Sequence, residues 1–343
     1  MSNNTLPTDQ TGSTILPDPR QETVPRRIGA FFAQPVVIVW MIFVLMFPLS
    51  RIVSPNFPSL GQLESTLILG LFLVVVAFGQ GFVILTGGFD LSVPQTVALG
   101  AFLTGYLANT GWPVLGAIAA ATIGCAVMGL INGLLVAHAK FPPFIVTLAT
   151  GSILGSVLLG VSRGTPAQPS PAALSSLFSG KESFLGVPTP IWALVIFALI
   201  AYLIQMRSTI GRRTYAVGNS EIASRVAGVP VSSTLIIVYT FAGISSGLAG
   251  IMLLGYSSGA DLNIGASWLL PSITAVVVGG SAIRGGAGSY VGTIGGALLL
   301  TVLSIDLSAA GASEGVKQIL YGVIILIALI AARLGKDTGA ART

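Results

Sequence analysis

Few side chains in this sequence could perform covalent or metal chemistry. The chain has a single cysteine, Cys125, within an apolar run, and a single histidine, His138, beside Lys140. A zinc site needs several such ligands, and a cysteine nucleophile needs a histidine partner, so one of each provides neither. The residue types therefore predict no metal site, no cofactor site and no catalytic residue in this chain.

Phosphate binding is the next chemistry to consider, in the run "GGSAIRGGAGSYVG" (279–292). Gly280 and Gly285 have the spacing of a Walker A motif, but Gly286 stands where that motif requires lysine. The chain therefore cannot hydrolyse ATP alone. We interpret the glycines as sites where helix backbones approach each other closely in lipid.

Asp90 is the most conspicuous carboxylate, in "GGFDLSVPQT" (87–96). Either Asp90 or Ser92 can cap a following helix, and Pro94 fits the first turn of that helix. This reading places Asp90 near the water interface, with a buried functional carboxylate as the alternative. Asn132 lies in "GLINGLL", and because a buried amide in lipid normally seeks a partner, we expect it to bond between helices near a central pathway.

Carriers driven by protons or sodium usually hold carboxylates or histidine inside their spans. Besides Asp90, this sequence offers Glu64 near the start of one apolar run and Asp306 just past another. None of the three has an obvious partner. If transport is active, its energy is expected to come from another polypeptide.

The segment "GRRTYAVGNSEIASRVAGV" (211–229) is polar although only 8% of the whole chain is charged. A short surface helix is predicted over 219–228, with Asn219 as N-cap, Gly228 as a left-handed C-cap and Pro230 preventing continuation. Ile222 and Val226 share one face of this helix. Ala223 and Ala227 lie at the edge of that face, and the remaining positions are Glu221, Ser224 and Arg225. Two helical turns are marginally stable alone, so the helix needs a partner surface, unless the segment is an ordinary solvated loop.

Composition defines the class of protein that contains this segment. Hydrophobic residues make up 53% of the 343 residues. Soluble domains are about 25% charged, so this chain is a polytopic membrane protein. The net charge of +5 comes from basic residues scattered between apolar runs, which indicates membrane orientation and no nucleic-acid partner.

About 20 apolar residues are needed to cross a bilayer as a helix. Continuous, non-alternating runs predict an all-α fold of about ten transmembrane helices. The predicted spans are 33–49, 62–86, 91–109, 113–137, 143–162, 190–206, 233–255, 262–280, 287–305 and 316–334. The eighth is interrupted by Gly265 and Pro271, so the sequence leaves open whether it crosses fully.

The basic residues predict the orientation of these spans. With the N-terminus in the cytoplasm, twelve of the 16 lysines and arginines fall on the cytoplasmic side. Both termini and the 207–232 loop are then cytoplasmic. We expect a flexible tail at 1–29 without a removable signal peptide, a transmembrane domain at 30–335 and a short cytoplasmic tail at 336–343.

Four stretches resemble one known family. They are "GGFDLSV" (87–93), "INGLLVAHAKFPPFIVTLATGSI" (131–153), "GRRTYAVGNSEIASRVAGV" (211–229) and "TAVVVGGSAIRGGAGSYVGTIGGALL" (274–299). In this order they are similar to the membrane permease subunits of ATP-binding-cassette importers of the ribose and autoinducer-2 type. The sequence departs from the family at Pro94, where relatives usually have glycine, and at "SWLLPSITAVVVGG", where many relatives carry acidic residues.

The resemblance implies an architecture and a set of partners. Spans two to five and seven to ten would form an inverted repeat of two four-helix blocks. The loop between spans six and seven would carry a coupling helix that docks on a cytoplasmic ATPase, which uses ATP and Mg. In this chain the coupling motif would fall on Gly218, Glu221, Ala223, Ala227 and Gly228. A second permease subunit, an extracytoplasmic solute-binding protein and a bacterial inner membrane location are also implied.

Three functions remain open from the sequence. The importer permease is favoured, for a sugar or sugar-like small polar solute. A secondary carrier or channel would transport without an ATPase. A membrane-embedded enzyme would need a convergent set of titratable groups, and the sequence offers none.

Overall fold

The fold is all-α, and each of the ten predicted spans contains one helix. The computed structural model describes residues 34–163 and 168–340, with the backbone alone for 331–340. The predicted tail at 1–29 lies outside the described residues. The ten helices are α2 (Pro35–Leu49), α3 (Leu60–Leu85), α4 (Val93–Asn109), α5 (Val114–Ala137), α6 (Pro143–Ser162), α8 (Thr189–Arg207), α11 (Val231–Ser257), α12 (Leu269–Val278), α13 (Tyr290–Ala309) and α14 (Glu314–Ala340). Because α14 extends to Ala340, residues 336–340 of the predicted C-terminal tail are helical.

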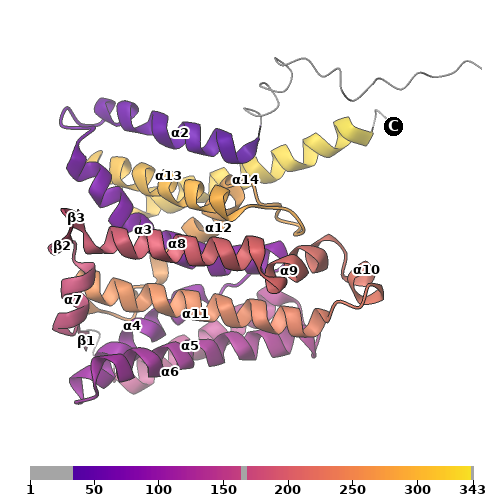
Figure 1. Cartoon of the computed structure of the whole chain (residues 1–343), viewed down its shortest axis with the longest axis horizontal. Helices are drawn as coiled ribbons and strands as arrows, with labels where there is room; N and C mark the ends of the chain where they lie inside the picture. Colours follow the sequence, from indigo (N-terminus) through magenta and orange to yellow (C-terminus); the bar gives the residue numbers. More distant parts are fainter. Residues whose placement is uncertain (1–33, 164–167, 341–343) are drawn as a thin grey trace, which may run out of the picture. The chain divides into compact units, whose positions relative to one another are not determined.

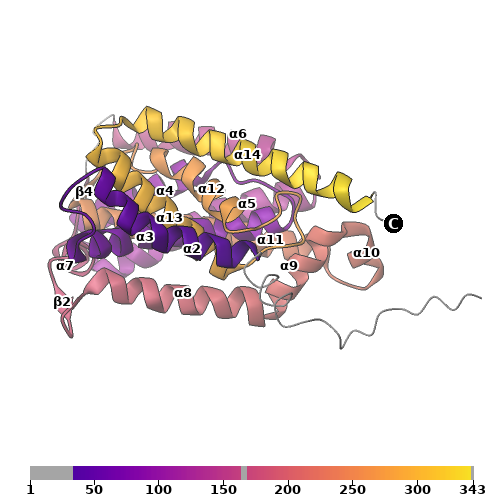
Figure 2. The same ribbon diagram turned by 90° about the horizontal axis from the view of Figure 1, so that it is seen from above.

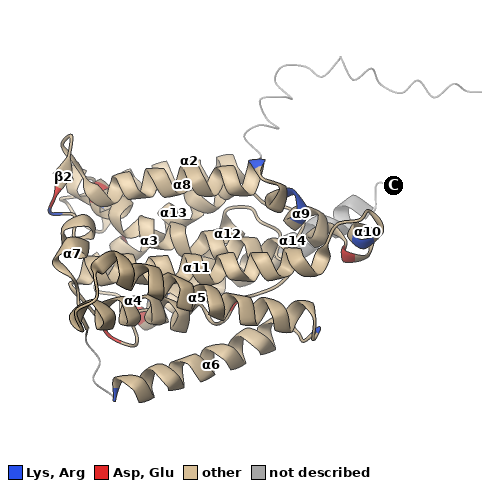
Figure 3. Ribbon diagram, turned by 60° about the horizontal axis from the view of Figure 1, so that its bottom comes forward, with Lys and Arg blue, Asp and Glu red and all other residues tan. Residues whose placement is uncertain are grey.

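Seven helices of the described chain are long and apolar enough to cross a membrane. They are α2 with its following 3-10 turn η2 (Ser50–Ile52), α3, α5, α6, α8, α11 and α13. Charged residues lie mostly toward the two ends of the bundle, and the stretches of helix between them contain few (Figure 3). This distribution is the one that a lipid environment requires.

The eighth predicted span is shorter than expected. The segment from 262 to 280 contains only a 3-10 turn, η3 (Ala266–Trp268), and the ten-residue helix α12. Ten residues rise about 15 Å, roughly half the thickness of a hydrocarbon core. As a straight helix this segment does not span, because Gly265 and the residues before it are not helical.

The two predicted blocks contain the same order of long and short helices. In the first, long α3 is followed by irregular residues 86–92 and by α4, which has 17 residues. In the second, long α11 is followed by irregular residues 258–265 and by short α12. The segment before η3 and α12 meets the start of α4 closely, since a Cβ on Gly265 would overlap the Pro94 carbonyl oxygen. The inverted orientation of the two blocks stays a prediction.

Helices α3 and α11 form the centre of the bundle. Helix α3 is mostly enclosed by the rest of the protein: 89% of its most apolar 18-residue stretch is buried. Helix α11 packs most extensively on α5, α4 and α3, while α3 also packs on α13, α12 and α8. Small residues allow these contacts: a Cβ on Gly79 of α3 would lie 2.7 Å from the Ala242 Cα of α11. Backbones approach this closely where the side chain is only a hydrogen.

The glycine-rich run at 279–292 also mediates close packing, as predicted. A Cβ on Gly279 would lie 2.5 Å from the backbone carbon of Gly292, which joins the end of α12 to the start of α13. No phosphate-binding geometry is needed to explain these glycines.

The bundle has two different ends, which Figures 1 and 2 show at left and right. One end carries the short helix α7 (Ala172–Phe178) and two small β-ladders: β1 (Gln168–Pro169) pairs with β4 (Gly259–Ala260), and β2 (Ser183–Phe184) pairs with β3 (Val187–Pro188). The other end carries α9 (Thr209–Asn219) and α10 (Glu221–Val226), between α8 and α11. We call these the α7 end and the α10 end.

Candidate functional site: the coupling surface and a buried polar network

The polar segment after α8 folds into two helices that project from the α10 end (Figure 1). Ser208 caps α9 by accepting a hydrogen bond from Gly211 N at 3.1 Å. Ser220 caps α10 by accepting from Ala223 N at 3.2 Å. The predicted N-cap, Asn219, is therefore wrong by one residue. Asn219 is the last residue of α9, and its amide donates to the carbonyls of Tyr215 at 2.9 Å and Gly286 at 3.1 Å.

Gly228 ends α10 in the predicted left-handed conformation, with φ of 76°. Gly228 N donates to the Arg225 carbonyl at 3.1 Å, and Val229 N donates to the Ser224 carbonyl at 2.9 Å. This pair of bonds is a Schellman motif. A Cβ on Gly228 would meet nothing within 4 Å, so the position requires glycine for its backbone conformation and not for space.

The two faces of α10 differ sharply in exposure. Ile222 is 79% exposed and Val226 is 86% exposed, on the predicted shared face. Ser224, predicted among the polar outer positions, is instead buried. Glu221 and Arg225 form an i, i+4 ion pair of 2.5 Å, with about half of each side chain in solvent. An exposed ion pair adds little stability. Ile222 and Val226 form an apolar face that nothing in the described chain covers.

A cavity of about 660 Å³ separates α10 from the spans. Glu221, Ile222 and Arg225 form one wall, while Gly88 and Tyr239 belong to the opposite side. The cavity leaves α10 attached mainly through α9 and through the turn into α11.

Helix α9 is in direct backbone contact with the spans. A Cβ on Gly218 would overlap the carbonyl oxygen of Leu85, at the end of α3, and would lie 2.5 Å from Gly286 N. Gly286 N itself donates to the Leu85 carbonyl at 2.9 Å. Three segments thus meet at one carbonyl group: α9, the end of α3 and the α12–α13 loop.

Tyr215 makes a second connection that the sequence did not reveal. Its hydroxyl donates to the Gly288 carbonyl at 2.8 Å and accepts from Gln205 Nε2 at 3.0 Å. A tyrosine hydroxyl is protonated at neutral pH and can donate, and burial raises the pKa of Tyr215 further. Tyr215 lies three residues before Gly218 and therefore on the same face of the helix. This spacing is the sequence feature from which the connection could have been predicted.

Asp90 is buried inside the protein, and its predicted place near the water interface stays a prediction. The side chain is 2% exposed. Its Oδ1 accepts from Ser92 N at 2.8 Å and from Ser92 Oγ at 2.5 Å. Residues 86–92 leave the end of α3 and turn back inside the bundle, so the carboxylate is covered by protein. The structure shows a buried carboxylate, and a functional role for it stays a prediction.

Asn132 is also buried, and it bonds between helices as expected. Its Nδ2 donates to Ser92 Oγ at 3.0 Å, and its Oδ1 accepts from Thr150 Oγ1 at 2.6 Å. Ser92 is the N-cap residue of α4, but its hydroxyl serves Asp90 and Asn132 instead of capping the helix. Pro94 occupies the first turn of α4, as predicted. This polar network ties the start of α4 to α5 and α6.

The fold defines a multi-pass α-helical membrane protein with two short helices, α9 and α10, projecting from one end. Residues 62–329 match the family described as "Branched-chain amino acid transport system / permease component". The chain belongs to this family of permease components.

Several relatives resemble the chain over most of its length. It is 37% identical to the ribose import permease protein RbsC of Bacillus subtilis, over 84% of this chain and 89% of the relative. It is 35% identical to RbsC of Escherichia coli K12, over 81% and 87% of the two chains. It is 34% identical to the autoinducer 2 import system permease protein LsrD of Photorhabdus laumondii, over 75% and 78%. No solved structure matches the chain.

Proposed function

We propose that this chain is the transmembrane permease subunit of an ATP-driven, binding-protein-dependent importer for a sugar or sugar-like small polar solute. Its coupling surface consists of Gly218, Asn219, Glu221, Ile222, Ala223, Arg225, Val226, Ala227 and Gly228. The observation that carries this proposal is the uncovered apolar face of α10, joined through α9 to the backbone of α3. The relatives named for ribose and autoinducer 2 import support the solute class.

The partners follow from this role. A cytoplasmic ATP-binding-cassette ATPase covers Ile222 and Val226 and supplies the energy from ATP and Mg. A second permease subunit, identical or different, completes the translocation pathway in the lipid bilayer. A solute-binding protein delivers the solute at the α7 end. The chain lies in the bacterial inner membrane with both termini in the cytoplasm.

Asp90 and Asn132 belong, in this proposal, to the wall that surrounds the pathway. Both are buried and face protein, so they hold α4, α5 and α6 in register and do not contact the solute directly. A network of this kind lets a displacement of α3 reach α4 through residues 86–92.

Reconstitution tests the proposal against a secondary carrier or channel. The permease is placed in liposomes alone, or with its cognate ATPase, its binding protein and ATP with Mg. We expect uptake of radiolabelled sugar only in the complete system. Uptake by the permease alone, driven by the sugar gradient or by an ion gradient, would support the carrier or channel and overturn the importer. The relatives, all named as import permeases, do not favour that alternative.

A further inference from the structure

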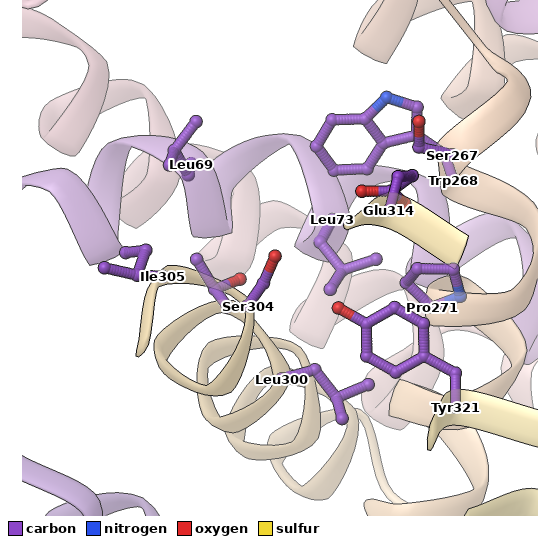
Figure 4. A pocket seen from close by; sticks show the side chains of 11 residues that line it. Leu69, Leu73, Ser267, Trp268, Pro271, Leu300, Ser304, Ile305, Glu314 and Tyr321 are labelled. Carbon is purple, nitrogen blue, oxygen red and sulfur yellow. The ribbon is translucent and has the colours of Figure 1, made fainter. Parts of the chain in front are cut away.

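A second cavity, of about 200 Å³, lies away from the coupling surface (Figure 4). Side chains from α3, the η3–α12 segment, α13 and α14 line it. Its lining combines the aromatic rings of Trp268 and Tyr321 with the polar groups of Ser267, Ser304 and Glu314. Leucines of α3 and α13 complete the wall. A small pocket with an apolar body and a few convergent polar groups is the usual form of a small-molecule site.

The cavity lies toward the α7 end. Helix α13 begins at Tyr290, directly after the loop that contacts Asn219, and therefore runs away from the α10 end. Ser304 is near the finish of α13, and Glu314 is the first residue of α14. A solute delivered at the α7 end would meet this cavity before it reached the middle of the bundle.

Trp268 presents a fixed ring to the cavity. Its indole N–H donates to the Ile264 carbonyl at 3.1 Å, so the polar edge of the ring is already satisfied. Phe72 packs edge to face on the ring, with centroids 6.1 Å apart. A ring held in this way offers an apolar face for the C–H groups of a sugar ring, at little entropic cost.

The polar groups of the cavity can exchange hydrogen bonds with hydroxyl groups. Glu314 bonds within its own helix, to Lys317 at 3.4 Å and Gln318 at 3.3 Å, and about half of its side chain is exposed. A carboxylate has about four acceptor positions, so Glu314 can accept further bonds. Tyr321 is buried, and Figure 4 shows its hydroxyl directed into the cavity toward Ser304.

The charges of the residues that line the cavity indicate which class of solute it can bind. Of the residues that line the cavity, Glu314 alone is charged. Lys317 pairs with Glu314 at 3.4 Å, so these two side chains together carry no net charge. A phosphorylated or carboxylated solute would bring a charge for which the lining offers no further ion pair. We propose that this cavity is a binding subsite for a neutral monosaccharide, stacked on Trp268 and hydrogen-bonded to Glu314 and Tyr321. The proposal rests on the proposed import function and adds to it a place where the permease itself holds the solute.

Fluorescence of Trp268 tests the subsite directly. The full-length permease carries four tryptophans, so Trp40→Phe, Trp112→Phe and Trp192→Phe together leave Trp268 as the single reporter. In lipid nanodiscs we titrate D-ribose, D-xylose, D-galactose and D-glucose, with D-ribose 5-phosphate as the charged counterpart. At least one neutral sugar should change the fluorescence saturably in the millimolar range, and the phosphate ester should not.

Matched variants distinguish binding from a general effect of sugar. In the Trp268 reporter background, Glu314→Gln and Tyr321→Phe should each weaken binding about tenfold, the loss expected for one hydrogen bond to a sugar hydroxyl. Glu182→Gln and Tyr106→Phe, both at exposed positions, should leave it unchanged. Equal affinities in all four variants, or no saturable change with any of the sugars, would overturn the subsite.

A lipid chain is the competing occupant, because leucines form part of the wall. Nanodiscs with brominated lipid would then quench Trp268 strongly, and sugar would not relieve the quenching; this result also overturns the proposal. The import function is judged separately, by ATP-driven sugar uptake in the complete reconstituted system. If uptake persists while the Trp268 signal is absent, the subsite fails alone. If the wild-type complex takes up no sugar, the import proposal fails.

Discussion

Gly218 on α9 lies against Leu85 at the end of α3, so closely that a Cβ on the glycine would overlap the Leu85 carbonyl oxygen. The same oxygen accepts the backbone N–H of Gly286 at 2.9 Å. Leu85 also precedes residues 86–92, which carry Asp90 and lead into α4. The contact between these two residues therefore links the projecting helices to the most buried span and to the polar network.

Replacing Gly218 by alanine should break this linkage. The added methyl must displace backbone atoms, and over-packing of this kind costs about 1–3 kcal/mol. We expect a lower thermal unfolding temperature in detergent and reduced ATP-driven uptake. Gly322→Ala is the control, because a Cβ on Gly322 would meet nothing within 4 Å. Similar behaviour of the two variants would show that the contact is not needed.

Cysteine labelling should establish the orientation of the bundle. Cys125 is buried, and Cys125→Ala removes it as a background site. With an impermeant thiol reagent on intact cells, Ser170→Cys near the α7 end should react and Ser220→Cys at the α10 end should not. Permeabilised cells provide the control, since both positions should then react. If Ser220→Cys alone were labelled on intact cells, the topology would be the reverse of the one proposed.

The sequence predicted most of the fold because lipid imposes one simple requirement on the spans. Long apolar runs mark helices, and the boundaries of α6 were predicted to the residue. The eighth segment was harder because Gly265 and Pro271 are compatible with a distorted span as well as with a short helix. Only the close approach of Gly265 to Pro94, distant in sequence, distinguishes the two.

The sites were predicted less completely, for two physical reasons. Asn219 and Ser220 are both good N-caps, and the choice depends on Gly286, which is 67 residues from Asn219 and accepts its amide. Asp90 resembles a helix cap because its neighbours are turn-forming residues, but Ser92 is the N-cap residue of α4. Its burial results from the return of residues 86–92 into the bundle, which local sequence does not encode. Gly228, in contrast, was predicted correctly because its backbone conformation depends on adjacent residues alone.

The polar network of Asp90, Ser92, Asn132 and Thr150 should be needed for transport more than for membrane insertion. Asn132→Leu would remove the bonds from Asn132 to Ser92 and from Thr150 to Asn132, each worth about 0.5–1.5 kcal/mol, while Thr150 keeps its bond to the Thr147 carbonyl. We expect normal insertion, a lower unfolding temperature and reduced uptake. Thr150→Val should have a smaller effect in the same direction.

Thr122→Val is the matched control for the network, because the Thr122 hydroxyl bonds only to Ile118 within its own helix. It should retain wild-type uptake and stability. Wild-type uptake by Asn132→Leu would mean that the network is dispensable and that Asn132 has no part in the pathway wall.

The turn that ends α10 provides the sharpest test of coupling. Gly228→Val should uncouple the complex, because a β-branched residue resists the positive φ that the Schellman motif requires. Gly228→Asn should retain coupling, since asparagine tolerates this conformation. Glu221→Lys should also uncouple, because it places a cation at the start of α10 and opposite Arg225, where each like-charge contact is unfavourable.

The measurement is ATP hydrolysis by the reconstituted complex, with and without loaded binding protein. In Gly228→Val and Glu221→Lys the permease should insert and the binding protein should still dock, but stimulation of hydrolysis and uptake should be lost. The space around Gly228 is open, so a loss in the valine variant that asparagine restores must come from backbone conformation and not from steric overlap. Full stimulation in the valine and lysine variants would show that 219–228 has no part in coupling, and the ATPase would then have to contact another part of the α10 end.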